Sequence, residues 1–151
     1  MDYHGKMKRL PLLLLPLALP LAGCGSLNAA PTAGQLLDAP TSLNLSGQPL
    51  TAQAFPAVSN GVFSVKVKVR SLKAALPDVK VTGVYVVTND GVWEASSAER
   101  GPLKCGLQCA FMVGSGPANG LAAGQGVQVV LGLKDTKGRE LLLRDPQAQV
   151  K

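Results

Sequence analysis

The segment 62–70 carries the most regular pattern in this chain of 151 residues, an alternation of apolar and polar side chains from Phe63 to Arg70. The apolar side chains, which share one face of an extended strand, are Phe63, Val65, Val67 and Val69. The polar side chains, which share the other face, are Ser64, Lys66, Lys68 and Arg70. A helix would scatter the apolar set around its axis, so this period of two predicts a half-buried β-strand. The rest of the chain must supply a sheet around it.

Similar short runs of alternating or apolar residues, separated by Gly, Pro, Asn and Asp, continue along the chain. We expect further strands over 42–46, 48–56, 79–88, 92–95, 109–113, 127–134 and 139–144. The segment 79–88 has apolar residues in both phases, which predicts a central strand or one whose outer side is covered. The segment 48–56 is less regular and is expected at a sheet edge. The side chains expected to point inward from these other strands include Leu50, Phe55, Trp93 and Phe111.

The segments between these strands are rich in residues that favour turns. The sequences at 89–91 and 135–138 predict hairpin turns. The segment 71–76 predicts a single helical turn, which Pro77 ends. We expect 96–104 to be a polar loop. The segment 114–126 contains five glycines and one proline and is expected to be a long connection.

Many short strands without a long amphipathic helix predict an all-β fold, an antiparallel sandwich of about seven strands. A small β-barrel is the alternative. The sandwich is expected over 41–146, followed by a tail over 147–151. The glycine-rich lead-in, the strand over 127–134 and the hairpin that follows resemble the end of immunoglobulin-like or fibronectin-III-like domains. The Cys…Trp…Cys arrangement of true immunoglobulin domains is missing from this sequence.

The N-terminal residues have the features of a secretory signal. Lys6, Lys8 and Arg9 precede a run of 13 residues, mostly apolar, over 10–22, which is shorter than the roughly 20 residues of a membrane-spanning helix. The run ends in Leu21-Ala22-Gly23-Cys24, which resembles the lipobox of bacterial lipoproteins. An ordinary cleaved signal with a chance cysteine is the alternative.

The resemblance to lipoproteins implies a processed and acylated N-terminus. The signal peptide would cover residues 1–23, beginning at Met1 or at Met7. Cys24 would carry a diacylglyceryl group with fatty acyl chains such as palmitate. Residues 24–40 are expected to form the lipidated N-terminus and a flexible tether, within which residues 36–37 dock on the domain or form a brief helical turn. Asp after the cysteine retains many lipoproteins at the inner membrane, whereas Gly25 and Ser26 here favour the outer membrane or the cell surface.

Removal of the signal also changes the composition. The mature chain of 128 residues is large enough for one domain and has a net charge of about +4, which predicts no nucleic-acid partner. The one histidine, His4, leaves with the signal. Catalytic triads and metal sites that depend on histidine are therefore excluded. We expect no enzyme activity, no cofactor and no metal site.

Cys105 and Cys109 are the two cysteines of the predicted domain. In an extended strand they would lie about 13 Å apart, so a disulfide requires the chain to turn at Gly106. Export favours oxidation, and we favour a structural disulfide. A redox pair is the alternative, but the Cys-x-x-Cys motif on a βαβ unit is absent. Free thiols are the other alternative.

Two sets of charged residues are candidates for binding or chemistry. Lys66, Lys68 and Arg70 form a basic stripe that either contacts anionic lipid headgroups or is simply a solvated face. Seven acidic residues are spread singly, mostly in predicted turns, and a glycosidase would need two of them brought together. They are Asp78, Asp90, Glu94, Glu99, Asp135, Glu140 and Asp145.

The sequence therefore predicts a non-catalytic, lipid-anchored domain of the cell envelope that binds a protein partner or supports an envelope assembly. The membrane would be contacted through the lipid on Cys24, and the expected contact surfaces are the loops at 96–104 and 114–126. The second hypothesis is a glycan- or lipid-binding module, which an exposed Trp93 beside Tyr85 would favour. The third is a hydrolase that depends on carboxylates.

Overall fold

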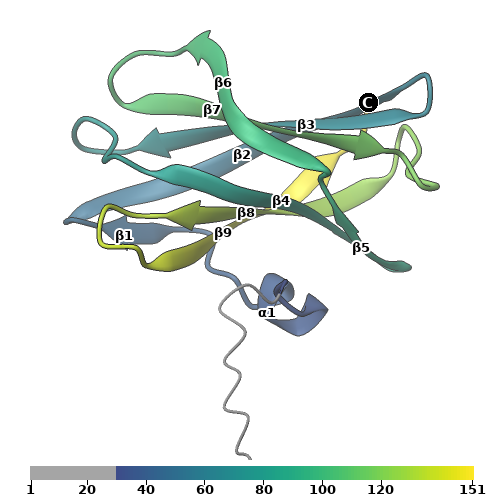
Figure 1. The fold of residues 1–151 in the computed structure, drawn as a ribbon, viewed down its shortest axis with the longest axis horizontal. Helices are drawn as coiled ribbons and strands as arrows, with labels where there is room; N and C mark the ends of the chain where they lie inside the picture. The colour runs from purple at the N-terminus through teal and green to yellow at the C-terminus, as the bar shows by residue number, and fades with distance from the viewer. Residues whose placement is uncertain (1–29) are drawn as a thin grey trace, which may run out of the picture. The chain divides into compact units, whose positions relative to one another are not determined.

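The structure is a computed structural model that describes residues 30–151, with one short helix and nine strands in that range (Figure 1). The signal segment and Cys24 lie outside the described residues. The elements are α1 (Ala33–Leu37), β1 (Leu43–Leu45), β2 (Gln48–Ser59), β3 (Val62–Ser71), β4 (Lys80–Thr88), β5 (Gly91–Glu94), β6 (Ser97–Lys104), β7 (Cys109–Pro117), β8 (Gly126–Lys134) and β9 (Glu140–Gln149).

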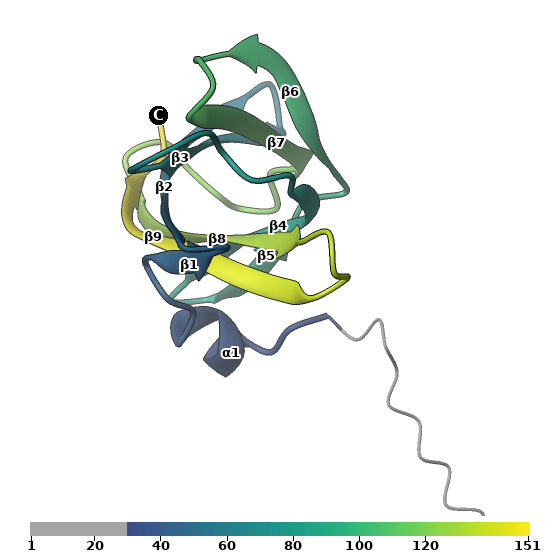
Figure 2. The ribbon, with the colours of Figure 1, turned by 90° about the vertical axis from the view of Figure 1, so that its left-hand side faces the viewer.

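The strands form two antiparallel sheets that pack face to face, which confirms the predicted all-β sandwich (Figure 2). One sheet has the order β1-β2-β3-β7-β6, and the other has the order β5-β4-β8-β9. The order β2-β3-β7-β6 opposite β4-β8-β9 corresponds to A-B-E-D opposite C-F-G in immunoglobulin-type sandwiches. The described residues do not close into a barrel, so the alternative of a small β-barrel is wrong.

Strand β3 is half-buried, as its regular alternation predicted, and it lies at the centre of the five-stranded sheet. It pairs with β2 on one side and with β7 on the other. Its four apolar side chains are buried between the sheets. Strand β4 is central in the other sheet and is buried on both faces, also as predicted.

Two segments differ from the secondary structure that the sequence predicts. Residues 96–104 were expected to be a loop, but most of them form the edge strand β6, which pairs with β7. Because β6 lies at the edge of its sheet, it is paired on one side only and its other side faces solvent. Such a strand can form with few apolar side chains. The expected helical turn at 71–76 is absent, since the backbone N–H groups of Ser71 and Leu76 donate to Gln108 and Leu107 of a neighbouring loop.

The two sheets meet along the β2 and β9 edges. The N–H of Lys151 donates to the carbonyl of Pro56, and the N–H of Val58 donates to the carbonyl of Lys151, both at 3.0 Å. Pro56 has no N–H, and this is tolerated because its backbone faces away from β3. Residues 147–151, expected to be a tail, therefore include the end of β9 and a hydrogen-bonded terminus.

The largest side chains of the core meet between β3 and β5. The rings of Phe63 and Trp93 pack edge to face with their centroids 4.7 Å apart. Trp93 is only 7% exposed, and its indole N–H donates to the carbonyl of Pro117 at 2.7 Å. The prediction that Trp93 fills the core is confirmed. Space for this ring comes from Gly116 of β7, where a Cβ would lie 3.2 Å from the indole.

Helix α1 covers the outer face of the four-stranded sheet. Thr32 and Gln35 form a capping box that starts the helix. Leu36 is fully buried in a cluster that also contains Tyr85, Val87 and Val130. The structure thus places residues 31–40 with the domain, although the sequence suggested a flexible tether up to residue 40.

Arg144 of β9 fastens the segment that follows α1. Its side-chain Nε donates to the carbonyl of Ala39 and its backbone N–H donates to the carbonyl of Pro40, both at 2.9 Å. A second guanidinium nitrogen donates to Gln128 at 2.7 Å. These bonds fix the segment 39–40 against the sheet edge. Within residues 30–151, no helix is long and apolar enough to cross a membrane.

Candidate functional site

The basic stripe lies on the outer face of the five-stranded sheet. Lys66, Lys68 and Arg70 project from β3 away from the core, where Lys66 and Arg70 are exposed and Lys68 is half-buried. The strand on either side contributes the neighbouring positions, β2 on one side and β7 on the other. The three cations therefore sit in the interior of an open sheet face and not at its edge.

Aromatic side chains flank this row of cations on both sides. Phe55 of β2 pairs with Lys66 in the sheet register and is 45% exposed. Phe111 of β7 pairs with Lys68, and its ring centroid lies 5.9 Å from the ammonium nitrogen of Lys66. Such a distance is typical of a cation–π contact. We call Lys66, Lys68, Arg70, Phe55 and Phe111 the basic face.

Both aromatic predictions on these strands are wrong. Phe55 and Phe111 were expected in the core, and each belongs to the outer face of the sheet. In β7 the buried positions are Ala110 and Met112, because they pair with Val69 and Val67 of the core face of β3. In β2 the buried positions near Phe55 are Ala54 and Pro56. Phe55 and Phe111 thus place their rings on the outer face of the sheet and not in the core.

The cations of the basic face are not neutralised by acidic neighbours. Among the side chains that the structure describes, the one ion pair joins Arg139 to Asp135 in the turn between β8 and β9. Glu99 of β6 pairs with Val113 and so shares the same sheet face, but it makes no ion pair with the basic residues. The basic face therefore presents a concentrated positive charge to solvent.

A shallow groove of about 340 Å³ runs beside the basic face, between β2 and β9. We call it the edge groove, and its polar and aromatic lining includes Gln53, Phe55, Asp145, Gln147, Gln149 and Lys151. Asp145 is committed to the fold: one carboxylate oxygen accepts from the N–H of Ala54 at 2.8 Å, and the other accepts from the N–H of Gln147 at 3.1 Å. Phe55 belongs to both the groove and the basic face, so the two surfaces are continuous.

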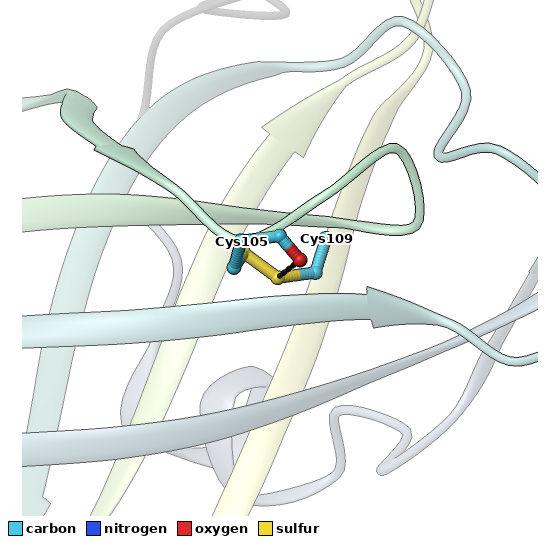
Figure 3. The surroundings of a disulfide bond; sticks show 2 residues. All are labelled: Cys105 and Cys109. Carbon is cyan, nitrogen blue, oxygen red and sulfur yellow. Dashed lines mark hydrogen bonds between the residues drawn. A yellow bond between two sulfur atoms is a disulfide. The ribbon is translucent and has the colours of Figure 1, made fainter.

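The disulfide between Cys105 and Cys109 is present, which confirms the structural pairing (Figure 3). The two Cα atoms are 5.5 Å apart, so the chain turns as the pairing requires, and Gly106 adopts a positive φ of 99°. The bond closes the connection between β6 and β7. Leu107 at its tip is 84% exposed. The disulfide holds this tip against residues 71–76, from which the carbonyls of the tip accept two backbone hydrogen bonds.

Loss of this disulfide is expected to lower the free energy of unfolding by about 2 kcal/mol, because closing a five-residue loop restricts the unfolded chain only modestly. The measurement is urea unfolding of the wild type and of the Cys105→Ser/Cys109→Ser variant, with and without a reducing agent. Reductant should weaken the wild type and leave the variant unchanged. Equal stability of all four samples would show that the bond contributes nothing.

The described residues offer little of the expected alternative chemistry. Trp93 is buried, so the exposed Trp93–Tyr85 pair that would have favoured a ligand pocket is not formed. Burial, and secondarily the charges of Glu94 and Glu140, raise the pKa of the Tyr85 hydroxyl above its ordinary value. Among residues 30–151, no group of three or more His, Cys, Asp or Glu side chains is placed to hold a metal ion.

The acidic residues are used partly in turns and partly in the fold. Asp135 accepts hydrogen bonds from the N–H groups of Lys137 and Arg139, as expected of a turn residue. Desolvation by itself raises the pKa of the Asp135 carboxyl, but these hydrogen bonds and the Arg139 guanidinium together lower this pKa below its ordinary value. Asp145 was also expected in a turn, and instead joins β9 to β2.

No protein-family model matches this chain, and no curated protein matches it. The functional interpretation therefore depends on the residues and the geometry described above.

Proposed function

We propose that this chain is a lipid-anchored, non-catalytic domain of the cell envelope that binds a partner through the basic face. The observation that carries the proposal is the row of three cations on an open sheet face, flanked by two aromatic rings and without an acidic partner. Maintaining three like charges side by side opposes folding slightly, so an anionic partner would relieve this repulsion. In this proposal the sandwich is an immunoglobulin-like domain and its N-terminus is acylated.

Two features support an envelope location. The sequence Leu21-Ala22-Gly23-Cys24 has the pattern of a lipobox, and Gly25 and Ser26 after it favour the outer membrane or the cell surface. The disulfide between Cys105 and Cys109 suits an oxidising compartment outside the cytoplasm.

The tether in this proposal is short. Only residues 25–30 separate Cys24 from Pro31, the first residue of the folded unit. Their fully extended length, together with the flanking bonds, is at most about 25 Å. Pro31 leads directly into α1, which packs on the four-stranded sheet, whereas the basic face belongs to the five-stranded sheet (Figure 2). An anchor at Cys24 would therefore hold the folded unit within about 25 Å of the membrane.

The nature of the partner has several alternatives. A protein partner or an envelope assembly was the first expectation from the sequence, and a glycan- or lipid-binding module was the second. The edge groove beside the basic face favours the glycan. A hydrolase that depends on carboxylates receives less support, because Asp145 in the groove is occupied by backbone hydrogen bonds.

Replacing Cys24 with alanine is expected to abolish membrane attachment. The measurement compares the intact mass and the membrane partition of the wild type and the Cys24→Ala variant after expression in a bacterial host. The wild type should begin at Cys24, carry acyl chains and sediment with membranes, and the variant should do neither. An unacylated wild-type protein in the soluble fraction would contradict the anchor.

A further inference from the structure

We infer that the basic face and the edge groove together bind an anionic polysaccharide. This inference rests on the proposed function, since it names the chemistry of the partner that the basic face would bind. A polysaccharide offers two kinds of group that this surface complements: carboxylate or phosphate charges, and sugar rings with hydroxyl groups. The surface presents the matching groups in one continuous area, from the cations of β3 across Phe55 to the lining of the groove.

The cations suit an extended polymer. Lys66, Lys68 and Arg70 alternate along one strand, so neighbouring positions are about 6.7 Å apart and the row is about 13 Å long. A linear chain lying along β3 can place successive anionic groups on successive cations. Hydrogen bonds between charged groups are stronger than neutral ones, and they fix the register of such a chain.

The aromatic rings and the amides suit sugars. The face of an aromatic ring carries partial negative charge and attracts the C–H groups that a sugar presents on its flat side. Phe55 is the ring that is most available, because it is 45% exposed and stands between the cations and the groove. Gln53 and Gln147 line the groove with side-chain amides, which both donate to and accept from hydroxyl groups.

Two other partners fit this surface less well. The centre of a protein–protein interface is normally apolar and poor in charged residues, with the charges at the rim. The basic face has the reverse arrangement, with cations at its centre and rings at its flanks. An anionic bilayer would engage the cations but would leave the edge groove, with the amides of Gln53 and Gln147, without a partner.

The test uses the full acylated protein in detergent micelles and measures binding to polygalacturonate, which carries one carboxylate per sugar. Dextran is the neutral sugar control, and poly-L-glutamate supplies the same charge without sugars. Vesicles of phosphatidylcholine with and without phosphatidylglycerol test the lipid alternative, because the acyl chains on Cys24 insert into both kinds and only the vesicles with phosphatidylglycerol present anionic headgroups.

The matched variants remove the same charge from different surfaces. The Lys66→Gln/Lys68→Gln/Arg70→Gln variant should bind polygalacturonate about 100-fold more weakly, since three charge-assisted hydrogen bonds to the polymer are lost. The control variant Lys80→Gln/Lys134→Gln/Lys137→Gln, whose lysines are exposed elsewhere, should bind almost as well as the wild type. Phe55→Ala should weaken binding about fivefold through the lost ring contact.

Four other results would overturn the inference, and each would indicate a different kind of binding or none. Equal losses in both triple variants would indicate attraction by net charge alone. Poly-L-glutamate binding as tightly as polygalacturonate, with no effect of Phe55→Ala, would indicate an acidic protein partner. Stronger binding to vesicles with phosphatidylglycerol than to vesicles without it, lost in the Lys66→Gln/Lys68→Gln/Arg70→Gln variant and found without binding to polygalacturonate, would indicate lipid headgroups. No binding to polygalacturonate, to poly-L-glutamate or to phosphatidylglycerol would reject the surface as a site. Membrane attachment through Cys24 is measured separately and would remain if the glycan inference failed.

Discussion

Replacing Trp93 with alanine is expected to lower the free energy of unfolding by about 4 kcal/mol, which is large for a domain of this size. Trp93 is the largest side chain of the core, and its removal leaves a cavity beside Phe63. The same change removes the N–H donor that bonds the carbonyl of Pro117. Because Trp93 joins β5 to the end of β7, the loss weakens the contact between the two sheets.

The measurement is urea unfolding followed by circular dichroism, since the variant lacks the tryptophan whose fluorescence would otherwise report unfolding. Trp93→Phe is the matched control: it keeps an aromatic ring but cannot donate to Pro117. We expect this control to lose about 2 kcal/mol, roughly half of the alanine effect. A loss below about 1 kcal/mol in Trp93→Ala would show that Trp93 is not a central contact between the sheets.

Replacing Gly114 with valine is expected to cost about 3 kcal/mol through overpacking. Gly114 of β7 lies on the inner face of its sheet, opposite β4. A Cβ at this position would lie 2.7 Å from the Cβ of Val84 and 3.0 Å from the Cβ of Ala95. Neither neighbour can turn away, because both atoms are fixed to the backbone, so a side chain here forces the sheets apart.

The control for this experiment is Gly126→Val in β8. A Cβ at Gly126 has no atom within 4 Å, so the same chemical change adds no clash there. Thermal and urea unfolding of the two variants should show a large loss for Gly114→Val and a change within about 0.5 kcal/mol for Gly126→Val. If both variants lost the same stability, the cost would come from the residue type and not from the close approach of the sheets.

The alternation of apolar residues correctly predicted the half-buried strand β3. The prediction for Phe55 was wrong, and the alternation of side chains between the two faces of a strand explains why. Leu50 and Phe55 are five positions apart, so a regular strand points them to opposite faces. Leu50 is buried, and Phe55 is therefore necessarily outward in the observed strand β2. In β7 this rule gives no help, because the residues around Phe111 are apolar in both phases and only the pairing with β3 selects the buried set.

Glycine content misled the prediction for 114–126. Glycines usually indicate a connection, yet Gly114 and Gly116 lie within β7, which extends to Pro117. Their absent side chains make room for Val84 and Trp93 of the opposite sheet. This requirement arises from residues at least 20 positions away in the chain, so local composition cannot reveal it. The basic face was visible in the sequence, but the edge groove depends on β2 and β9 meeting, which only the folded chain shows.

If the proposed anchor crowds such domains on a membrane, the exposed edges of the two sheets affect whether neighbouring copies associate. Backbone groups on a free edge can pair with another copy, and anchoring in two dimensions makes collisions frequent. Here β1 and β5 contain three and four residues, β6 carries Pro102 and an irregular register, and β9 is bonded to Pro40. Where these features interrupt the edges, neighbouring copies find no long straight strand to extend, which opposes polymerisation into a shared sheet if the proposed anchor crowds the domain on a membrane.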